Sequence, residues 1–314
     1  EIILKALASK EIPRKIDILV VGNKKNLLSK YLFLQSLGIE NIVDPNKLNI
    51  EDLKISAANV KEPSNDTGHA SFLYLKHAID IVKKEPNCAL VTSPICKKLW
   101  NSAGHNYSGQ TELLSETCDS SNVGMLFTAK SPFTGWRFNT LLATTHIPIR
   151  EVPYKLDKNL INSKLNLLYE FCNKFKKNPT LHIAGLNPHA GEEGILGTEE
   201  IDFINKAVLH WKIKNPLVNL SNLISPDSCW ISSAKAWRED KINAPDGILA
   251  LYHDQGLIPV KIITLNYSVN TTIGLPIVRT SPDHGTGFDI ADKGIAQCQS
   301  MIEAIKTAND LLID

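Results

Sequence analysis

Short apolar runs alternate along the chain with longer stretches whose apolar residues recur at helical spacing. Runs of four to six residues are typical of buried strands, and the longer stretches are typical of helices that cover a sheet. The expected strands are residues 16–21, 89–92, 123–128, 141–145, 181–186 and 247–251. The expected helices are residues 27–37, 70–84, 159–175 and 300–311, with a further helix starting near Glu199. This alternation predicts the α/β class, with a largely parallel sheet covered by helices.

Three histidines, His146, His189 and His253, each follow an apolar run and adjoin a proline or glycine turn. Ligands of open α/β sheets bind beyond the carboxyl ends of the strands, so these side chains are well placed for chemistry. A single histidine in this context is more often structural. Three in the same context favour convergence on a metal ion, with imidazole ligands that leave coordination positions open for a substrate oxygen. Their separation is too long for a single-helix zinc motif, so the fold must assemble the site.

The stretch from Asp246 to Lys293 carries further candidate chemistry. Asp254 directly follows one of the three histidines, and the cations Lys261 and Arg279 suit anionic ligand groups. A polar turn between two strands is the simpler interpretation of this stretch, and it stays open at this point.

Glycines supply a second kind of candidate site. Gly285 and Gly287, or the evenly spaced Gly191, Gly194 and Gly197 before a helix, could let backbone N–H groups approach a pyrophosphate. Plain turns explain each set about equally well. The chain has no GxGxxG after its first strand, no GxSxG for a serine hydrolase and no GxxxxGK[ST] for a P-loop.

The composition restricts the classes of partner that the chain is expected to bind. The 314 residues include 34 basic and 33 acidic side chains, a balance that gives no field toward nucleic acid or an anionic membrane. No apolar run approaches the roughly 20 residues of a membrane span, and no signal peptide is visible. The six scattered cysteines are interpreted as reduced thiols of a cytoplasmic protein and not as zinc ligands.

Six segments together resemble one known family. They are TSPICK, SGQTELLSE, LATTHIPI, GLNPHAGEEGILGTEE, DGILALYHDQGLIPVK and SPDHGTGFDIADKG, in the family's order from Thr92 to Gly294. The chain is similar to the 4-hydroxythreonine-4-phosphate dehydrogenases, the PdxA family of vitamin B6 biosynthesis. The resemblance implies a two-lobed, three-layer α/β/α fold like that of isocitrate and isopropylmalate dehydrogenases, which bind NAD without the Rossmann fingerprint.

The resemblance also implies an organisation in which the first and last parts of the chain share a lobe. Lobe I is expected to comprise residues 1–105 and 255–314, and lobe II, with the dimer interface, residues 106–254. The active site is expected in the cleft between them. The family forms homodimers with a divalent metal, zinc, cobalt or magnesium, at the subunit interface.

Residue roles follow from the matching motifs. The implied metal ligands are the three histidines already singled out. The implied substrate-binding residues are Gln110, Thr111, Lys261, Asn270 and Arg279. Asp254 and Lys261 are the candidate catalytic residues, and we expect Asp254 to orient a hydrogen bond beside the metal or to help proton transfer. NAD or NADP is the implied cofactor, with the glycines named above as candidate contacts.

Two positions depart from the family pattern. Gln110 stands where the family usually has histidine, so a residue that cannot carry a proton replaces one that can. Asp292 stands where the family usually has glycine.

The implied reaction oxidises the secondary alcohol of 4-phosphooxy-L-threonine and then releases carbon dioxide, giving 3-amino-2-oxopropyl phosphate. Because Gln110 lies in a substrate segment, a 4-phosphothreonate or 4-phosphoerythronate dehydrogenase of sugar-acid catabolism is the alternative within the class. A metal-dependent hydrolase or acyltransferase without redox chemistry is the alternative from another class.

Overall fold

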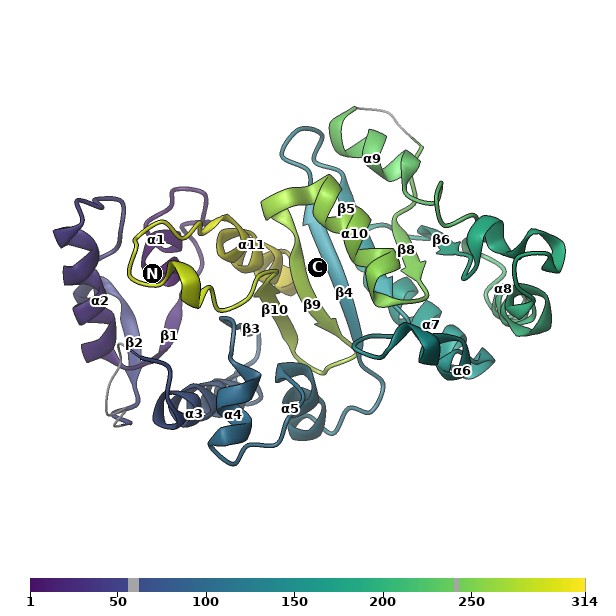
Figure 1. The fold of residues 1–314 in the computed structure, drawn as a ribbon. Coiled ribbons are helices and arrows are strands. Elements are labelled where there is room, and N and C mark those ends of the chain that lie inside the picture. The colour runs from purple at the N-terminus through teal and green to yellow at the C-terminus, as the bar shows by residue number, and fades with distance from the viewer. Residues whose placement is uncertain (56–61, 240–242, 314) are drawn as a thin grey trace. The chain divides into compact units, whose positions relative to one another are not determined.

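The computed structural model describes residues 1–55, 62–239 and 243–313 (Figure 1). The chain forms two compact units: Glu1–Ser121 with Leu275–Ile313, and Asn122–Gly274. The first unit is therefore discontinuous in sequence. The lobe limits expected from the sequence, after residues 105 and 254, stay a prediction.

The first unit contains two parallel strand pairs. β1 (Leu19–Gly22) pairs with β2 (Asn49–Asp52), and β3 (Ala89–Val91) pairs with β10 (Val278–Pro282). Its helices are α1 (Ile2–Ala6), α2 (Lys24–Ser36), α3 (Asn65–Val82), α4 (Lys97–Ser102), α5 (Gln110–Thr117) and α11 (Gln299–Ile313).

Helix α3 starts where its sequence provides a capping box. The Ser64 hydroxyl accepts a hydrogen bond from Thr67 N–H, and the Thr67 hydroxyl accepts one from Ser64 N–H, which satisfies two N–H groups at the helix start. The buried face of α3 then packs Phe72 and Ile79 in one core with Trp100 of α4 and Leu114 of α5. This core fixes the N-terminus of α5, where Gln110 lies.

The second unit is a mixed sheet in the order β9-β4-β5-β8-β6-β7. β4 is antiparallel to β5 and β9, whereas β5, β8, β6 and β7 run parallel. The strands are β4 (Gly124–Lys130), β5 (Arg137–Leu142), β6 (Thr180–Ala184), β7 (Asn219–Ile224), β8 (Gly247–Ala250) and β9 (Val269–Ile273). The main helices are α6 (Val152–Lys155), α7 (Lys158–Phe175), α8 (Asn205–Lys214), α9 (Ile231–Arg238) and α10 (His253–Thr264).

Helices cover both faces of this sheet. A β-carbon on Gly247 of β8 would meet Leu168 and Cys172 of α7, whereas one on Gly256 of α10 would meet Leu142 and Ala250. Successive residues of a strand point to opposite faces, so α7 and α10 lie on opposite sides. The second unit therefore has three layers, and the α/β class predicted from the sequence is confirmed.

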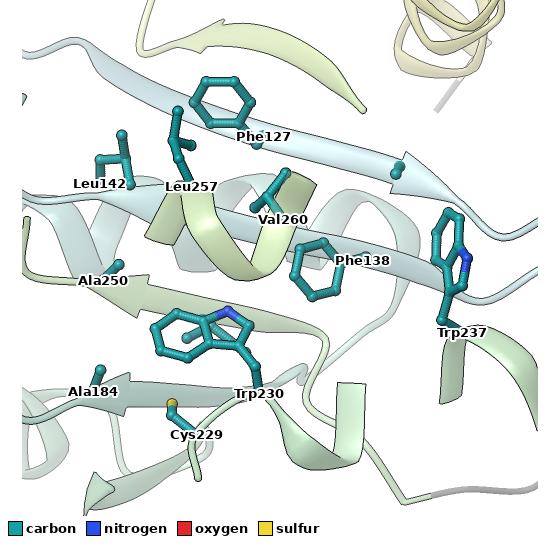
Figure 2. Close-up of a cluster of buried hydrophobic side chains, with 12 residues drawn as sticks. Phe127, Phe138, Leu142, Ala184, Cys229, Trp230, Trp237, Ala250, Leu257 and Val260 are labelled. Atoms are coloured by element: carbon teal, nitrogen blue, oxygen red, sulfur yellow. The ribbon is translucent and has the colours of Figure 1, made fainter. Parts of the chain in front are cut away.

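Aromatic and aliphatic side chains form the core between α10 and the sheet. Figure 2 shows Leu257 and Val260 of α10 among Phe127, Phe138 and Trp230. Phe127 comes from β4 and Phe138 from β5, and both are almost completely buried. This packing makes α10 a rigid support for the side chains at its N-terminus. Among the described helices, none is long and apolar enough to cross a membrane.

His182 on β6 gives the fold a weak acid sensitivity. Its Nδ1 is buried and has no hydrogen-bond partner among the described residues, and burial lowers the pKa of the imidazole below its ordinary value of 6.5. The imidazole therefore binds a proton more readily in the unfolded chain than in the folded one. The contribution of neutral His182 to the free energy of unfolding is complete above pH 6.5 and is lost as the pH falls below that value. Because the ring is half-exposed, His182→Gln should reduce the loss of unfolding free energy between pH 7.5 and pH 5.5 by only a few tenths of a kcal/mol. Urea unfolding at the two pH values measures this, and an identical loss in the variant contradicts it.

Candidate active site

The end of β8 leads directly into α10. All four residues of β8 are buried, and α10 begins at His253 after the extended residue Tyr252. Gln255 fixes this junction, because its Oε1 accepts from Leu251 N–H at 2.6 Å and its Nε2 donates to the Gly185 carbonyl at 2.6 Å. The sequence YHDQG therefore places His253 on a junction anchored to two neighbouring strand ends.

His253 and Asp254 form a close pair. His253 Nδ1 lies 2.7 Å from Asp254 Oδ1, and the side chains are 36% and 73% exposed. A carboxylate at one ring nitrogen favours the tautomer with its proton there, which leaves Nε2 as a lone-pair donor. Such a ring is prepared to act as a metal ligand.

His146 lies beside His253. It follows the end of β5 in the left-handed region, with φ of 48°, and the Thr144 hydroxyl donates to the Leu251 carbonyl at 2.8 Å, linking its loop to the start of α10. The His146 and His253 ring centres are 5.5 Å apart and tilted by 43°. Metal–nitrogen bonds of tetrahedral geometry place two imidazole ring centres roughly 5 Å apart, so the pair fits a shared divalent ion.

His189 lies on a different loop, which follows β6. The side chain is exposed, and its charge contributes to lowering the pKa of Asp227, after the larger effect of the hydrogen bond that Ser225 donates to that carboxylate. Among the described residues, no three His, Cys, Asp or Glu side chains are grouped closely enough to hold a metal. The structure thus brings two of the three predicted ligands together within one chain.

In the first unit, Arg279 of β10 is the centre of a buried polar cluster. Its Nη2 donates to Thr92 Oγ1 at 2.8 Å and to Gln110 Oε1 at 2.6 Å, and Gln110 Nε2 donates to the Ser93 carbonyl at 2.8 Å. Burial lowers the pKa of Arg279 to about 10, so the guanidinium is still charged at neutral pH. Thr111, the next residue of α5, is half-buried.

The contacts of this cluster explain why glutamine is suited to position 110. Its carbonyl oxygen accepts from a buried cation and its amide donates to a backbone carbonyl, so both ends of the amide are used. A protonated histidine at this position would place a second positive charge beside the buried guanidinium. Glutamine satisfies the same neighbours without that repulsion. Thr92 and Ser93 were not predicted as partners, although both stand at the end of a predicted strand.

The other two candidate substrate residues belong to the second unit. Lys261 is exposed on α10, eight residues after His253 and so about 12 Å further along the helix axis. Asn270 is half-buried on β9, and its Oδ1 has no hydrogen-bond partner among the described residues. A buried amide oxygen without a donor is free to accept from a ligand.

A pocket of about 520 Å³ lies in the first unit, lined by parts of α2, α3 and α4 and by Thr286, Phe288 and Asp292. The Tyr74 hydroxyl borders it, buried and without a partner among the described residues. Lys30 of α2 pairs with Asp292 across the rim. Asp292 has φ of 63°, the left-handed conformation that the family's glycine would adopt without strain and that aspartate tolerates better than most residues.

The predicted cofactor glycines fall into two settings. Gly285 has open space at its missing β-carbon, and Gly287 has φ of 61°; both flank Thr286 of the pocket. The other three glycines lie close to neighbouring side chains of the protein. A β-carbon on Gly191 would lie 2.8 Å from Glu200 Oε2, one on Gly194 would lie 3.3 Å from Ile201, and one on Gly197 would lie 2.3 Å from Asn187 Nδ2.

Comparison with known proteins adds independent information. A family model described as "Pyridoxal phosphate biosynthetic protein PdxA" matches residues 14–308. A Synechococcus sp. (strain RCC307) protein named 4-hydroxythreonine-4-phosphate dehydrogenase is 46% identical over 314 residues, covering 99% of this chain and 95% of that protein. A Nostoc sp. (strain PCC 7120) protein of the same name is 46% identical over 324 residues, covering 99% and 89%. The crystal structure of the Klebsiella pneumoniae protein of that name has a TM-score of 0.80 at 29% identity, covering 99% of this chain and 95% of that one.

Proposed function

The chain belongs to the PdxA family, and from that premise we propose that it is an NAD(P)-dependent, metal-assisted 4-hydroxythreonine-4-phosphate dehydrogenase. Its reaction oxidises the secondary alcohol of 4-phosphooxy-L-threonine and releases carbon dioxide to give 3-amino-2-oxopropyl phosphate, a step toward pyridoxal 5'-phosphate. The observation that supports the proposal most strongly is the His146–His253 pair, with the Asp254 carboxylate beside Nδ1 of His253.

The metal is assigned to His146, His189 and His253. A divalent cation held there, zinc, cobalt or magnesium, would supply positive charge that favours ionisation of the substrate alcohol and offsets the negative charge that develops during decarboxylation. The third ligand, His189, is not grouped with the other two within one chain, which is compatible with a site completed across the interface of a homodimer.

The chain's own residues bind and orient the substrate. Arg279, charged and held by Gln110 and Thr92, is suited to the phosphate or carboxylate. Lys261 offers a second cation, and Asn270 offers an amide oxygen for an N–H or O–H donor. Thr111 adds a hydroxyl beside Gln110. Each such contact restricts the orientation of the substrate and of its secondary alcohol, which is a large part of catalysis in such reactions.

Asp254 has the role of holding a proton at His253 Nδ1, so that Nε2 remains available. Lys261, the other candidate catalytic residue, contributes positive charge near developing negative charge on the substrate.

Residues of the first unit would hold NAD or NADP, which would supply the hydride acceptor. The pocket of about 520 Å³ is within the range of small-molecule sites, and Gly285 and Gly287 give a ligand close access to the backbone beside it. Gly191, Gly194 and Gly197 remain a second proposed contact surface.

An anaerobic assay tests the proposal. Purified protein is incubated with 4-phosphooxy-L-threonine, NAD or NADP, and zinc, cobalt or magnesium, and the absorbance of the reduced nicotinamide is followed. We expect metal-dependent reduction. Reduction only with 4-phosphothreonate or 4-phosphoerythronate assigns the chain to sugar-acid catabolism, an alternative favoured by Gln110 in a substrate segment. No reduction with any of the three substrates overturns the dehydrogenase assignment.

A further inference from the structure

The loop that carries His189 has an unusual backbone. Five consecutive residues, His189, Ala190, Gly191, Glu192 and Glu193, have φ between 42° and 83°. Four of the five are not glycine, and L-amino acids other than glycine rarely adopt this region in succession. Such a run persists only where surrounding groups hold it, and conformations of this kind cluster at functional sites.

Glu200 is the buried group that binds the start of this loop. Its side chain is 1% exposed, and its Oε1 accepts from Leu186 N–H at 2.8 Å and from Asn187 N–H at 2.7 Å. Its Oε2 accepts from Asn187 Nδ2 at 2.9 Å. One buried carboxylate thus binds three N–H groups of the two residues that precede the left-handed run.

Asn187 transmits this constraint to the run itself. Its carbonyl accepts from Ala190 N–H at 3.0 Å, so the residue bound by Glu200 also closes the turn around His189. Gly191 leaves room for Glu200, and Gly197 leaves room for the Asn187 side chain. The glycine spacing in this segment therefore serves the carboxylate that reaches beneath the turn.

We propose that Glu200 is a positioning residue that sets the direction of the His189 imidazole and thereby the affinity of the metal site. The proposal rests on the metal centre of the proposed function. Glu200 is buried and bound to Leu186 and Asn187, so it would act through Asn187 and the turn and not by direct contact with the metal or the substrate.

A glutamine at this position tests the carboxylate at constant shape. In Glu200→Gln the amide has one acceptor and one N–H₂ group, so in either orientation an N–H₂ faces a donor, Asn187 Nδ2 or the two backbone N–H groups. Glu199→Gln is the matched control, because Glu199 also accepts from Asn187 Nδ2, at 2.7 Å, but is less buried, and the backbone N–H groups of Leu186 and Asn187 donate to Glu200 instead.

The readout is the binding of Co²⁺ and Zn²⁺ to the purified protein, by calorimetry and by the visible spectrum of bound Co²⁺, beside circular dichroism and Tm. We expect Glu200→Gln to weaken metal binding by roughly 10- to 100-fold, and Glu199→Gln to change it by less than about 3-fold. In the turnover assay, excess metal should restore kcat of Glu200→Gln, and the circular dichroism and Tm of the metal-free protein show whether a general loss of stability contributes.

The outcomes distinguish failure of the positioning role of Glu200 from failure of the metal centre itself. A folded Glu200→Gln protein with wild-type metal affinity overturns the positioning role and leaves the proposed function intact. A wild type that binds no divalent metal overturns the metal centre and this inference together. If Glu200→Gln does not fold, Asn187→Ser replaces it: loss of the side-chain bonds to Glu199 and Glu200 should still weaken Co²⁺ binding severalfold, and unchanged binding overturns the role.

Discussion

Replacing Arg279 with methionine should lower kcat/KM for the phosphorylated substrate by roughly 30-fold to several thousand-fold, the equivalent of about 2–5 kcal/mol. The guanidinium is buried and keeps its charge at neutral pH, so the substrate anion would lose a desolvated partner that water cannot replace. Methionine keeps the length and packing of the stem but removes the charge and all five donors. Steady-state kinetics with varied substrate measure the effect, which should appear mainly in KM.

Folding should be much less affected by the same change. Methionine leaves Gln110 Oε1 and Thr92 Oγ1 without their donor, a penalty of about 1–3 kcal/mol, but it also removes the desolvation of a buried cation. These terms oppose each other, so Tm should shift by only a few degrees. Arg150→Met, at an exposed arginine, is the control and should change neither quantity. Wild-type kcat/KM in Arg279→Met would remove this residue from the substrate site.

The strands and helices that could be predicted from the sequence are those with strong local patterns. The run before His253 became β8, and the helical spacing of residues 159–175 became α7, which begins one residue earlier after the Asp157 N-cap. These segments carry their own signal, because burial on one or both faces dictates which positions are apolar.

The elements that could not be predicted depend on distant partners. β9 (VNTTI) and β10 (VRTSP) are short and rich in polar residues, and each becomes a strand because it pairs with a segment far away in the chain. No helix was predicted at the start of α10, where Gly256 and Pro259 both disfavour helix. The helix forms nonetheless, since glycine allows close packing on Leu142 and Ala250. Tertiary packing here overrides local propensity.

The same division applies to the candidate site. The histidines could be singled out because each lies within a few residues of the end of an apolar strand, a feature that the local sequence carries. The partners of Arg279 could not, because Thr92 and Gln110 are 187 and 169 residues away from it. The role of Glu200 was also hidden, since a glutamate before a helix is usually a solvated residue, whereas this one is buried beneath a turn.

Replacing His253 with alanine should abolish high-affinity metal binding and with it metal-dependent reduction of the nicotinamide. His253 is paired with a second histidine and oriented by a carboxylate, so its loss removes a direct bond and breaks the His146 pair. We expect kcat/KM to fall by at least about 10³-fold, because loss of the metal removes its electrostatic stabilisation of negative charge. Titration with Co²⁺, followed by its visible spectrum, and the anaerobic turnover assay measure the two effects separately. His189→Ala should behave in the same way.

Asp254→Asn supplies the graded comparison. It keeps the shape of the side chain and a carbonyl oxygen near Nδ1 but removes the negative charge that orients the ring, so metal affinity should fall by roughly 10- to 100-fold and not be abolished. His284→Ala is the control for loss of an exposed histidine outside the predicted ligand set. The order of effects is decisive: His253→Ala must be more severe than Asp254→Asn, and Asp254→Asn more severe than His284→Ala. Equal metal affinity in Asp254→Asn and the wild type would leave Asp254 without a role at the metal, and equal affinity in His253→Ala would place the metal elsewhere.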